Sequence, residues 1–400
     1  MRVEKLFVSI ACGLILAVSA CSPGSNETEL PDLGNVRFGD LNEDQLRRMV
    51  EIDPADDGPF HMVNLIKFRA KADYADGRET DLTGREADAL YAPFEFLEAI
   101  GAEIVFAGDV ESNLITLDGT EWEQIGIVRY PSRALFLEMV QDEEFRARAI
   151  HKDAGVEKSL VIVADLQESI MLPERDDIPN PATPDDQPVA IAHLLAYNAI
   201  ADYGPGSSEP ERTGREAMSL YEQGASAIAI EQGGGPLAWF KIEGVFIGDE
   251  REWDEFRINL FPSHAAFEAV VDDPTRQAGE VHRVAAIEDT YTTANQIIIN
   301  RLAEGDSGGG GLLEVTDNGT GTLCSDDTAC EGQEANKCLA VDGAGFCTVE
   351  GCTAGTCEGD YVCCHDCADF AADFLPFEGS ACFPSSQTSQ LTDVPMCTCD

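Results

Sequence analysis

The chain has 400 residues, of which 26 are Lys or Arg and 74 are Asp or Glu, so its formal net charge at pH 7 is −48. Such acidity repels nucleic acid and anionic lipid headgroups, so we predict no nucleic-acid partner. Beyond the N-terminal stretch, no apolar run is long enough to cross a bilayer, and we expect a soluble body.

The N-terminus has the features of a bacterial export signal. Its apolar run, Leu6–Val18, is too short to span a membrane comfortably. The run ends in Val18-Ser19-Ala20-Cys21, which is similar to a lipobox, so we predict a signal peptide over 1–20 and a membrane anchor formed by acylation of Cys21, for example with palmitate. An ordinary secretory signal with an incidental cysteine is the alternative. Ser22 stands where an inner-membrane retention signal would place Asp, which favours the outer membrane or the cell surface.

Composition divides the rest of the chain into segments. We assign 21–57 to the lipidated cysteine and a polar tether, with one candidate helix at Asn42–Ile52. Two repeats follow, at 58–167 and 188–302, and the acidic, proline-rich stretch 168–187 is the linker between them.

The two repeats share landmarks at a nearly constant spacing. Thr83-Gly84-Arg85-Glu86 returns 130 residues later as Thr213-Gly214-Arg215-Glu216, and Trp122 returns 131 residues later as Trp253. One offset over several landmarks indicates a tandem duplication rather than a chance similarity.

Each repeat has the same expected order of elements. In the first repeat, Thr83 and Glu86 have the spacing of a capping box at a helix start, and Leu90, Phe94 and Leu97 fall on one apolar face of that helix. The expected elements there are strand 61–68, helix 83–101, strands 103–117 and 122–130, a helix capped by Ser132, and strand 159–166. Those of the second repeat are strand 189–197, helix 213–232, strands 236–247 and 253–261, helix 263–288 and strand 296–302.

The order βαββαβ is typical of a ferredoxin-like unit, whose helices cover one face of the sheet only. The bare face of each sheet must be buried. We therefore predict an α+β fold in which two tandem ferredoxin-like repeats pack sheet-to-sheet, as an intramolecular dimer with pseudo-twofold symmetry. Such a chain is expected to be monomeric.

The C-terminal part differs sharply in cysteine content. We assign 303–323 to a Gly-rich spacer and 324–400 to a small disulfide-rich module, because a dense, even set of cysteines in an exported chain indicates disulfides. The segment Cys363-Cys364-His365-Asp366-Cys367 could instead bind zinc, but it lacks a matching second pair, so we predict no metal. The predicted disulfide cysteines are Cys324, Cys330, Cys338, Cys347, Cys352, Cys357, Cys363, Cys364, Cys367, Cys382, Cys397 and Cys399.

The motifs of the first repeat resemble those of the uncharacterised DUF 1330 family, a member of the dimeric α/β barrel superfamily. The resemblance is carried by Gly84-Arg85-Glu86, Tyr91, Trp122, Tyr130-Pro131-Ser132 and His151, and it covers roughly 58–302. It implies the fold. The superfamily includes small monooxygenases, haem-degrading enzymes, isomerases and proteins without known chemistry, so the resemblance does not imply one function.

Polar residues at equivalent positions of the repeats are the candidates for catalysis or ligand binding. A histidine late in the second helix is one pair, and it could act as acid or base beside a polar residue of the first strand. The alternative is that each histidine bonds a loop and holds the fold, and that each tyrosine is a core residue. The candidates are His151, His282, Asn64, His193, Tyr91 and Tyr221.

The sequence predicts a surface lipoprotein that binds a small molecule or an envelope partner and is more readily a binder than an enzyme. A cofactor-independent monooxygenase or isomerase using His151 or His282 is the first alternative, and adhesion through the Cys-rich tail is another. No phosphate-binding loop, dinucleotide glycine motif or metalloprotease motif is present, so we expect no cofactor. A catalytic pocket should enclose a histidine and a second polar group, whereas a scaffold should fill the same space with Leu, Phe and Val.

Overall fold

The computed structural model describes most of the chain between residues 30 and 302 and the backbone of five short strands beyond it. The described residues are 30–31, 33, 36–91, 93–169, 177–249, 251–302, 337–341, 344–348, 361–365, 381–384 and 398–399. The predicted signal peptide, Cys21, the spacer and most of the Cys-rich module lie outside them. No helix within the described ranges is long and apolar enough to cross a membrane.

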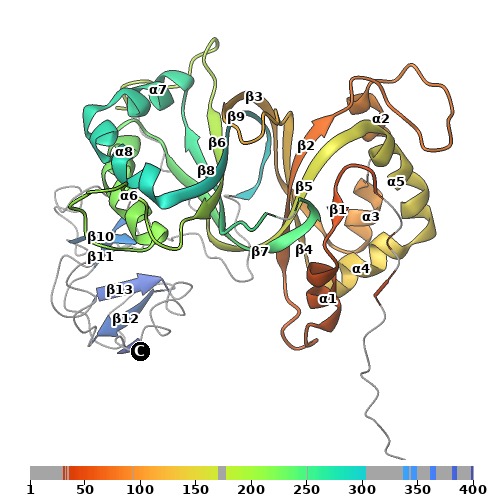
Figure 1. Ribbon diagram of the computed structural model, residues 1–400, viewed down its shortest axis with the longest axis horizontal. Coiled ribbons are helices and arrows are strands. Elements are labelled where there is room, and N and C mark those ends of the chain that lie inside the picture. The colour runs from red at the N-terminus through yellow and green to blue at the C-terminus, as the bar shows by residue number, and fades with distance from the viewer. Residues whose placement is uncertain are drawn as a thin grey trace, which may run out of the picture.

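Eight strands form an antiparallel sheet that closes on itself (Figure 1). They are β2 (Phe60–Phe68), β3 (Glu103–Ile115), β4 (Gln124–Tyr130), β5 (Val156–Ser169), β6 (Val189–Tyr197), β7 (Gly235–Gly248), β8 (Glu255–Phe261) and β9 (Ile287–Asn300). Around the barrel the order is β7-β5-β2-β4-β3-β9-β6-β8, and β8 pairs with β7 to close it. The expectation of an α+β fold with a barrel made by one polypeptide is confirmed.

The two halves of the barrel repeat one strand arrangement. The first half runs β5-β2-β4-β3 and the second runs β9-β6-β8-β7. The halves also meet edge to edge, because β3 pairs with β9 and β5 pairs with β7. The sequence predicted only a contact between sheet faces, and the structure adds these two hydrogen-bonded seams. Register shifts along both seams allow the long strands to bend around the barrel.

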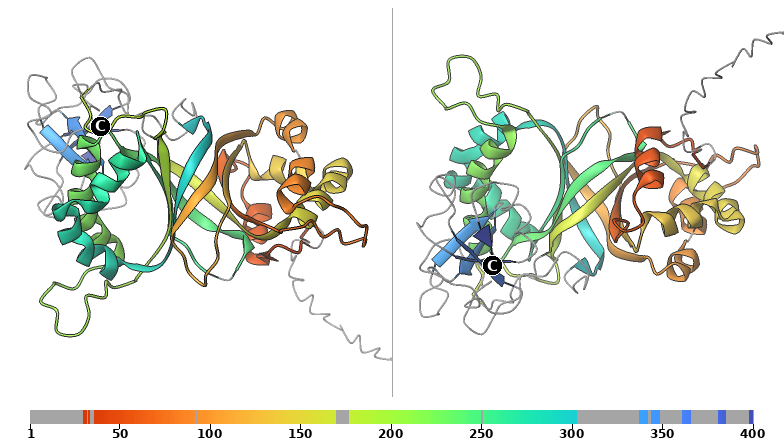
Figure 2. Two further views of the ribbon diagram at one scale, coloured as in Figure 1. Left: turned by 90° about the horizontal axis from the view of Figure 1, so that it is seen from above. Right: turned by 90° about the horizontal axis from the view of Figure 1, so that it is seen from below.

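Helices cover two opposite sides of the barrel, one side for each half (Figure 2). The first half carries α2 (Gly84–Tyr91), α3 (Phe94–Ala99), α4 (Arg133–Gln141) and α5 (Glu143–Gly155). The second half carries α6 (Gly214–Glu231), α7 (His264–Asp272) and α8 (Pro274–Ala286). A helical layer therefore lies over the outer face of each half of the sheet.

Three expected helices are each divided into two, and the one capped by Ser132 is divided at Asp142 between α4 and α5. The helix expected over 83–101 is interrupted before α3, where Pro93 is the N-cap and cannot donate a backbone hydrogen bond. As a result Leu90 and Phe94 are 50% and 60% exposed, and only Leu97 of the expected apolar face is buried. The helix expected over 263–288 is divided at a capping aspartate between α7 and α8.

Two strands are longer than expected. β9 begins at Ile287 instead of residue 296, because it pairs with β3 on one side and with β6 on the other. β5 continues to Ser169, two residues into the predicted linker, because it pairs along its length with β7. The seams between the halves therefore determine where these strands end.

The segment 36–52, expected as part of a tether, packs against the barrel instead. Helix α1 (Glu43–Glu51) confirms the candidate helix, and the short strand β1 (Asp40–Leu41) pairs with the end of β7. Leu46 and Met49, three residues apart on α1, are both 1% exposed. Burial of this apolar side holds the N-terminal segment in place against the first half.

The inside of the barrel is a packed apolar core. Trp122 and Trp253 are 1% and 6% exposed, and the centroids of their rings lie 5.5 and 5.6 Å from that of the Tyr291 ring. Side chains from both halves fill the surrounding space, among them Leu65, Phe106, Ile127, Ile162, Leu194 and Phe240. The interior is filled as a scaffold would fill it, and the two cavities described below lie outside it.

Short strands are described in the Cys-rich part of the chain. They are β10 (Lys337–Val341), β11 (Ala344–Thr348), β12 (Tyr361–His365), β13 (Ala381–Pro384) and β14 (Thr398–Cys399). The backbone register places Cys338 opposite Cys347, Cys363 opposite Cys382 and Cys364 opposite Cys399. The predicted disulfides remain a prediction.

Candidate functional site

The repeated Thr-Gly-Arg-Glu motif builds the start of the first helix in each half. The amide of Thr83 donates to Glu86 Oε2 at 2.8 Å, and the amide of Glu86 donates to Thr83 Oγ1 at 3.2 Å, which confirms the predicted capping box. The same reciprocal bonds join Thr213 and Glu216. Both glutamates are therefore engaged in holding a helix terminus.

The glycine of the motif allows three segments to meet at very short range. A Cβ on Gly84 would lie 2.4 Å from the carbonyl oxygens of both Arg69 and Gly155. A Cβ on Gly214 would lie 2.4 Å from the carbonyl oxygen of Asn198. In the first half the motif thus fixes the first helix against the end of the first strand and the end of the last helix. The frame that positions the candidate residues is therefore the same in both halves.

The two candidate histidines lie at equivalent places and bond equivalent tyrosines. Tyr74 Oη lies 2.6 Å from Nδ1 of His151, and Tyr203 Oη lies 2.8 Å from Nδ1 of His282. Burial lowers the pKa of His151, and the charge of Arg78 lowers it further. Neither histidine is among the described residues that line the two cavities discussed below. Each histidine ties a late helix to the loop that follows a first strand.

The first cavity lies between the helices of the first half and the outer face of its sheet, and its volume is about 480 Å³. This size is in the range of small-molecule sites, roughly 300 to 1,000 Å³. Part of its wall comes from the N-terminal segment and from the end of β7 in the second half. Most lining side chains are apolar, including Phe38, Met62, Phe136, Met139, Phe145 and Phe246.

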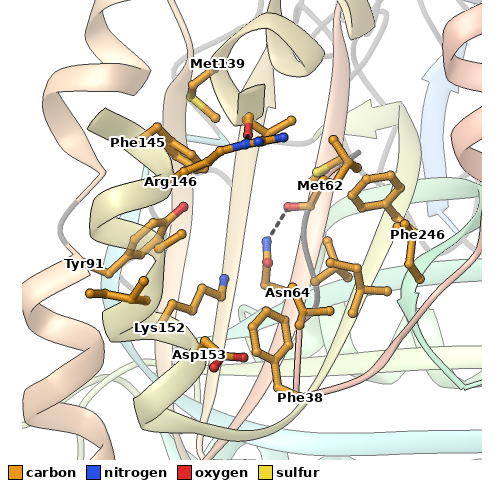
Figure 3. A pocket seen from close by; sticks show the side chains of 18 of the residues that line it. Phe38, Met62, Asn64, Tyr91, Met139, Phe145, Arg146, Lys152, Asp153 and Phe246 are labelled. Carbon is orange, nitrogen blue, oxygen red and sulfur yellow. Dashed lines mark hydrogen bonds between the residues drawn. The ribbon is translucent and has the colours of Figure 1, made fainter. Parts of the chain in front are cut away.

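Several polar side chains line this cavity, and Asn64, Tyr91 and Lys152 are among those labelled in Figure 3. Asn64 comes from β2, Tyr91 from the end of α2 and Lys152 from α5. The amide nitrogen of Asn64 donates to the backbone oxygen of Met62 at 3.2 Å. Arg146 lies at the exposed rim of the same cavity. The sequence had indicated Asn64 and Tyr91 as candidates, and both line this space.

Lys152 is a cation on the apolar stripe of α5, where it follows Phe145 and Ala149 at helical spacing. Its Nζ lies 5.5 Å from the ring centroid of Tyr91 and 5.8 Å from that of Phe38. Within the described part of the chain, Nζ has no hydrogen-bond or ion-pair partner. Burial lowers the pKa of Lys152, although the carboxylate of Asp88 acts in the opposite direction.

Burial also raises the pKa of the Tyr91 hydroxyl well above its ordinary value, and the nearby Tyr130 and Asp88 add to the rise. The phenol is therefore a neutral donor at physiological pH. It makes no hydrogen bond with another described residue. The cavity thus holds an ammonium group and a hydroxyl group whose partners would have to come from solvent or from a ligand.

The N-terminal segment is fixed beside Lys152 by an ion pair. Arg37 Nε lies 2.6 Å from Oδ2 of Asp153, and Arg37 Nη1 lies 2.9 Å from Oδ2 of Asp73. The backbone oxygen of Phe38 accepts a bond from the amide of Ser159 at 2.8 Å. These contacts hold Phe38 against the cavity and complete one of its walls.

The second cavity occupies the equivalent place in the second half and has a volume of about 330 Å³. Its helix α8 carries charges where α5 carries the apolar stripe, because Arg276, Glu280 and Arg283 stand 131 residues after Phe145, Ala149 and Lys152. Arg276 and Arg283 lie 3.1 and 2.9 Å from Glu280. Tyr221, the counterpart of Tyr91, accepts a hydrogen bond from Arg276 Nε at 3.0 Å.

A second set of charges closes the sheet side of this cavity. Arg257 forms ion pairs with both Glu222 and Glu255, and Arg215 lies 3.3 and 3.1 Å from the same two carboxylates. Burial acts to raise the pKa of Glu255, but the two arginines outweigh it and the pKa is lowered. The counterpart of Arg257 in the first half is Gly126, where an added Cβ would meet nothing within 4 Å.

His193, the counterpart of Asn64, lines the second cavity. Its Nδ1 lies 3.3 Å from Oγ1 of Thr292. Burial, with the charges of Arg283, Arg257 and Arg276, lowers the pKa of His193 to about 3. The imidazole is therefore neutral at physiological pH, and each half brings a neutral polar strand residue to its own cavity.

The structure places Asn64 and Tyr91 in the first cavity and His193 and Tyr221 in the second, whereas His151 and His282 bond loop tyrosines and are in neither lining. The sequence had left open whether each histidine joins a strand residue around a ligand or bonds a loop, and the observed contacts are of the second kind. The structure also brings Lys152 into the first cavity, a residue that the sequence pattern had not singled out. The available signal was a lysine at the inward position of a helix otherwise apolar on that side. Among the described residues, no group of three or more His, Cys, Asp or Glu side chains could hold a metal ion.

No family model matches the chain, and no curated protein matches it either. The solved structure of a protein of unknown function from Rhodopseudomonas palustris is 33% identical, covers 32% of this chain and 94% of that one, and has a TM-score of 0.28. The solved structure of an anthrone oxidase-like protein is 14% identical, covers 61% of this chain and 93% of that one, and has a TM-score of 0.36. The solved structure of a chlorite dismutase variant from Candidatus Nitrospira defluvii is 9% identical, covers 63% of this chain and 95% of that one, and has a TM-score of 0.33.

The TM-scores of these similarities are all low, and the closed barrel is established by the strand pairings of this chain alone. What the neighbours bind or transform does not carry over, because one fold supports many unrelated functions. The chain is thus an α+β protein with a closed, antiparallel eight-strand barrel formed by a single polypeptide.

Proposed function

We propose that the first cavity binds a small, largely apolar organic molecule through one oxygen-bearing polar group. The observation that carries this proposal is the Lys152 ammonium group, which faces an apolar cavity of about 480 Å³ and has no partner among the described residues. An unpaired cation in such a place costs stability unless a counter-charge or an acceptor reaches it. A ligand oxygen would supply that partner, and the apolar walls would bury the rest of the ligand.

The contacts favour binding over the histidine-based catalysis considered as the alternative. His151 and His282 are each bonded to a tyrosine, and the described cavity linings do not include them. A general base must come within hydrogen-bond reach of the proton that it removes. Lys152, Tyr91 and Asn64 meet this condition for a molecule in the first cavity.

The two halves support the proposal that the barrel arose by duplication of one ferredoxin-like unit, similar to the DUF 1330 family. The support is their common strand order and the repeated helix-start motif. In this history one copy kept an open cavity, while the other acquired ion pairs in the same place.

We further propose that the protein acts at the bacterial envelope, held there by acylated Cys21. The support is the segment Val18-Ser19-Ala20-Cys21. Cells fed a labelled fatty acid should incorporate the label into the wild-type protein and not into Cys21→Ala, which should leave the membrane fraction. Label that persists in Cys21→Ala would refute the anchor.

Ligand binding can be tested with two fluorescent probes that share one ring frame. 8-Anilinonaphthalene-1-sulfonate carries a single negative charge, and N-phenyl-1-naphthylamine carries none. We expect the purified full chain to bind both, and Lys152→Met to raise the Kd of the sulfonate about tenfold or more, because a hydrogen bond to a charged group contributes roughly 1.5–3 kcal/mol. Fluorescence titration measures both affinities.

Three results together would support the assignment of the site. The neutral probe should keep its affinity within about twofold in Lys152→Met, since the apolar walls are unchanged. Lys152→Arg should retain most of the sulfonate affinity. The control Lys241→Met, at an exposed lysine of β7, should change neither probe. If the sulfonate binds equally well to wild type and Lys152→Met, or if wild type binds neither probe, the proposal is wrong.

A further inference from the structure

The cavity offers more than a positive charge, and this inference rests on the proposed ligand binding there. We propose that Lys152 forms a reversible imine with an aldehyde or ketone bound in the first cavity, with Tyr91 as the hydrogen-bond donor to the carbonyl oxygen. The ligand class is then a small, largely apolar carbonyl compound.

Burial shifts Lys152 toward the neutral amine that such chemistry requires, while the two aromatic rings beside Nζ favour the ammonium form. Its Nζ lies over the rings of Tyr91 and Phe38, and no described carboxylate comes within 4 Å of it. The carboxylate that acts on the charge of Lys152 is Asp88 on α2, whose Oδ1 is buried without a hydrogen-bond partner. Burial raises the pKa of Asp88 and lowers that of Lys152, so both groups shift toward their uncharged forms.

Tyr91 supplies the second requirement, a donor for the carbonyl oxygen. Its hydroxyl lines the same cavity and makes no hydrogen bond with another described residue. Figure 3 shows the Tyr91 side chain on the α5 side of the cavity, with Lys152 next to it and Asn64 across from it. A carbonyl carbon near Nζ would therefore place its oxygen within the space that the phenol faces.

The reaction balances without any other reactant. The lone pair of Nζ forms a C–N bond to the carbonyl carbon, and the carbonyl oxygen takes up a proton to give a carbinolamine. The C–O bond then breaks as the C=N bond forms, the oxygen leaves as water with a second proton, and nitrogen has supplied both protons that the oxygen takes up. Amine and carbonyl become imine and water, with no change in oxidation state.

The second half gives the natural contrast. The counterpart of Lys152 is Arg283, which pairs with Glu280 at 2.9 Å. A guanidinium group stays protonated in proteins and is not a nucleophile. The same fold position can therefore hold charge in both halves, but it can form an imine in the first half only.

Reductive trapping tests the proposal in the full chain. The probe is 1-naphthaldehyde, and sodium borohydride reduces any imine to a stable secondary amine that peptide mass spectrometry locates. We expect Lys152 to be labelled at least tenfold more than the described lysines Lys67, Lys71, Lys158 and Lys241. We also expect Tyr91→Phe to slow labelling of Lys152 several-fold while the affinity for N-phenyl-1-naphthylamine stays unchanged.

Lys152→Arg separates this inference from the proposed binding function. It keeps a positive charge, so 8-anilinonaphthalene-1-sulfonate should still bind, while naphthaldehyde labelling should fall to the level of the surface lysines. If the wild type binds the probes but labels Lys152 no more than Lys241, imine formation is refuted and ligand binding stands. If the wild type neither binds the probes nor labels Lys152, both proposals fail.

Discussion

The two cavities occupy equivalent places in equivalent frames, yet they handle buried charge in opposite ways. In the second half, Arg276, Glu280 and Arg283 neutralise one another along α8. In the first half the same helix positions are apolar except for Lys152, which has no partner among the described residues. The comparison shows that the fold does not decide what lines a cavity, since three side chains on one helix can form ion pairs along its wall or place a single cation there.

The difference has an energetic consequence. A paired charge keeps its compensation in the unliganded protein, whereas a single ammonium group facing apolar walls is compensated only by solvent or a ligand. The ion pairs of the second cavity are therefore expected to stabilise their half of the barrel. The ammonium group of the first cavity is expected to lower the stability of the unliganded protein, and it is available to bind a ligand. Opposite responses to the removal of one charge would sharpen this contrast.

The largest effect is expected from Glu222→Gln. Glu222 is 7% exposed and pairs with both Arg257 and Arg215. The substitution keeps the shape of the side chain but leaves two arginines with Glu255 as their main counter-charge at this place, which should lower the free energy of unfolding by about 3 kcal/mol. Urea unfolding at pH 7 measures the change.

Lys152→Met is the matched removal of charge in the first half. It should leave the free energy of unfolding equal to that of the wild type or raise it, because an uncompensated cation is replaced by an apolar side chain of similar length. Equal losses in Glu222→Gln and Lys152→Met would contradict the distinction between a structural charge network and an open site.

A smaller effect is expected from His193→Asn, which installs the residue found at the equivalent position in the first half. The pKa of His193 is lowered to about 3 in the folded protein, against about 6.5 when unfolded. As the pH falls below 6.5, the unfolded chain takes up a proton that the folded chain refuses. This group therefore removes stability between pH 6.5 and 3, on the order of 1 kcal/mol per pH unit.

The measurement is urea unfolding of wild type and His193→Asn at pH 6.5, 5.5 and 4.5. The variant should lose less stability on acidification, and the gap between the two proteins should change steadily across this range. Other titrating groups, such as His264 with its raised pKa, are common to both proteins and drop out of the difference. Parallel curves would show that His193 titrates normally and that the arginines around it do not set its charge state.

Several local features could be predicted because neighbouring residues specify them. The capping boxes at Thr83 and Thr213 follow from side chains three residues apart, and β6 lies over 189–197 as expected. Ser132 caps α4 as expected. The common order of elements in the two repeats follows from the repeated sequence, and with it the closed α+β barrel.

The candidate site could be predicted only in part. Asn64, His193, Tyr91 and Tyr221 line cavities, but the described histidines His151 and His282 bond tyrosines from distant loops instead. Hydrogen-bond partners that lie 77 and 79 residues apart leave no pattern in a single sequence. Lys152 could not be predicted for the same reason. Its lack of an ion-pair partner depends on α2, β2 and the N-terminal segment, none of which places a described carboxylate within ion-pair distance of it.

The sequence by itself determined the repeat, the order of the helices and strands, and the helix N-termini that carry a cap, because these depend on the sequence pattern and on contacts within a few residues. Only the tertiary structure decided that the halves join edge to edge, that Val36, Phe38 and Leu41 line the first cavity, and that Lys152 faces apolar side chains. Burial and charge pairing are properties of groups brought together from distant parts of the chain, so equivalent frames with similar sequences could still end with one cavity that holds a single cation and one that is lined by ion pairs.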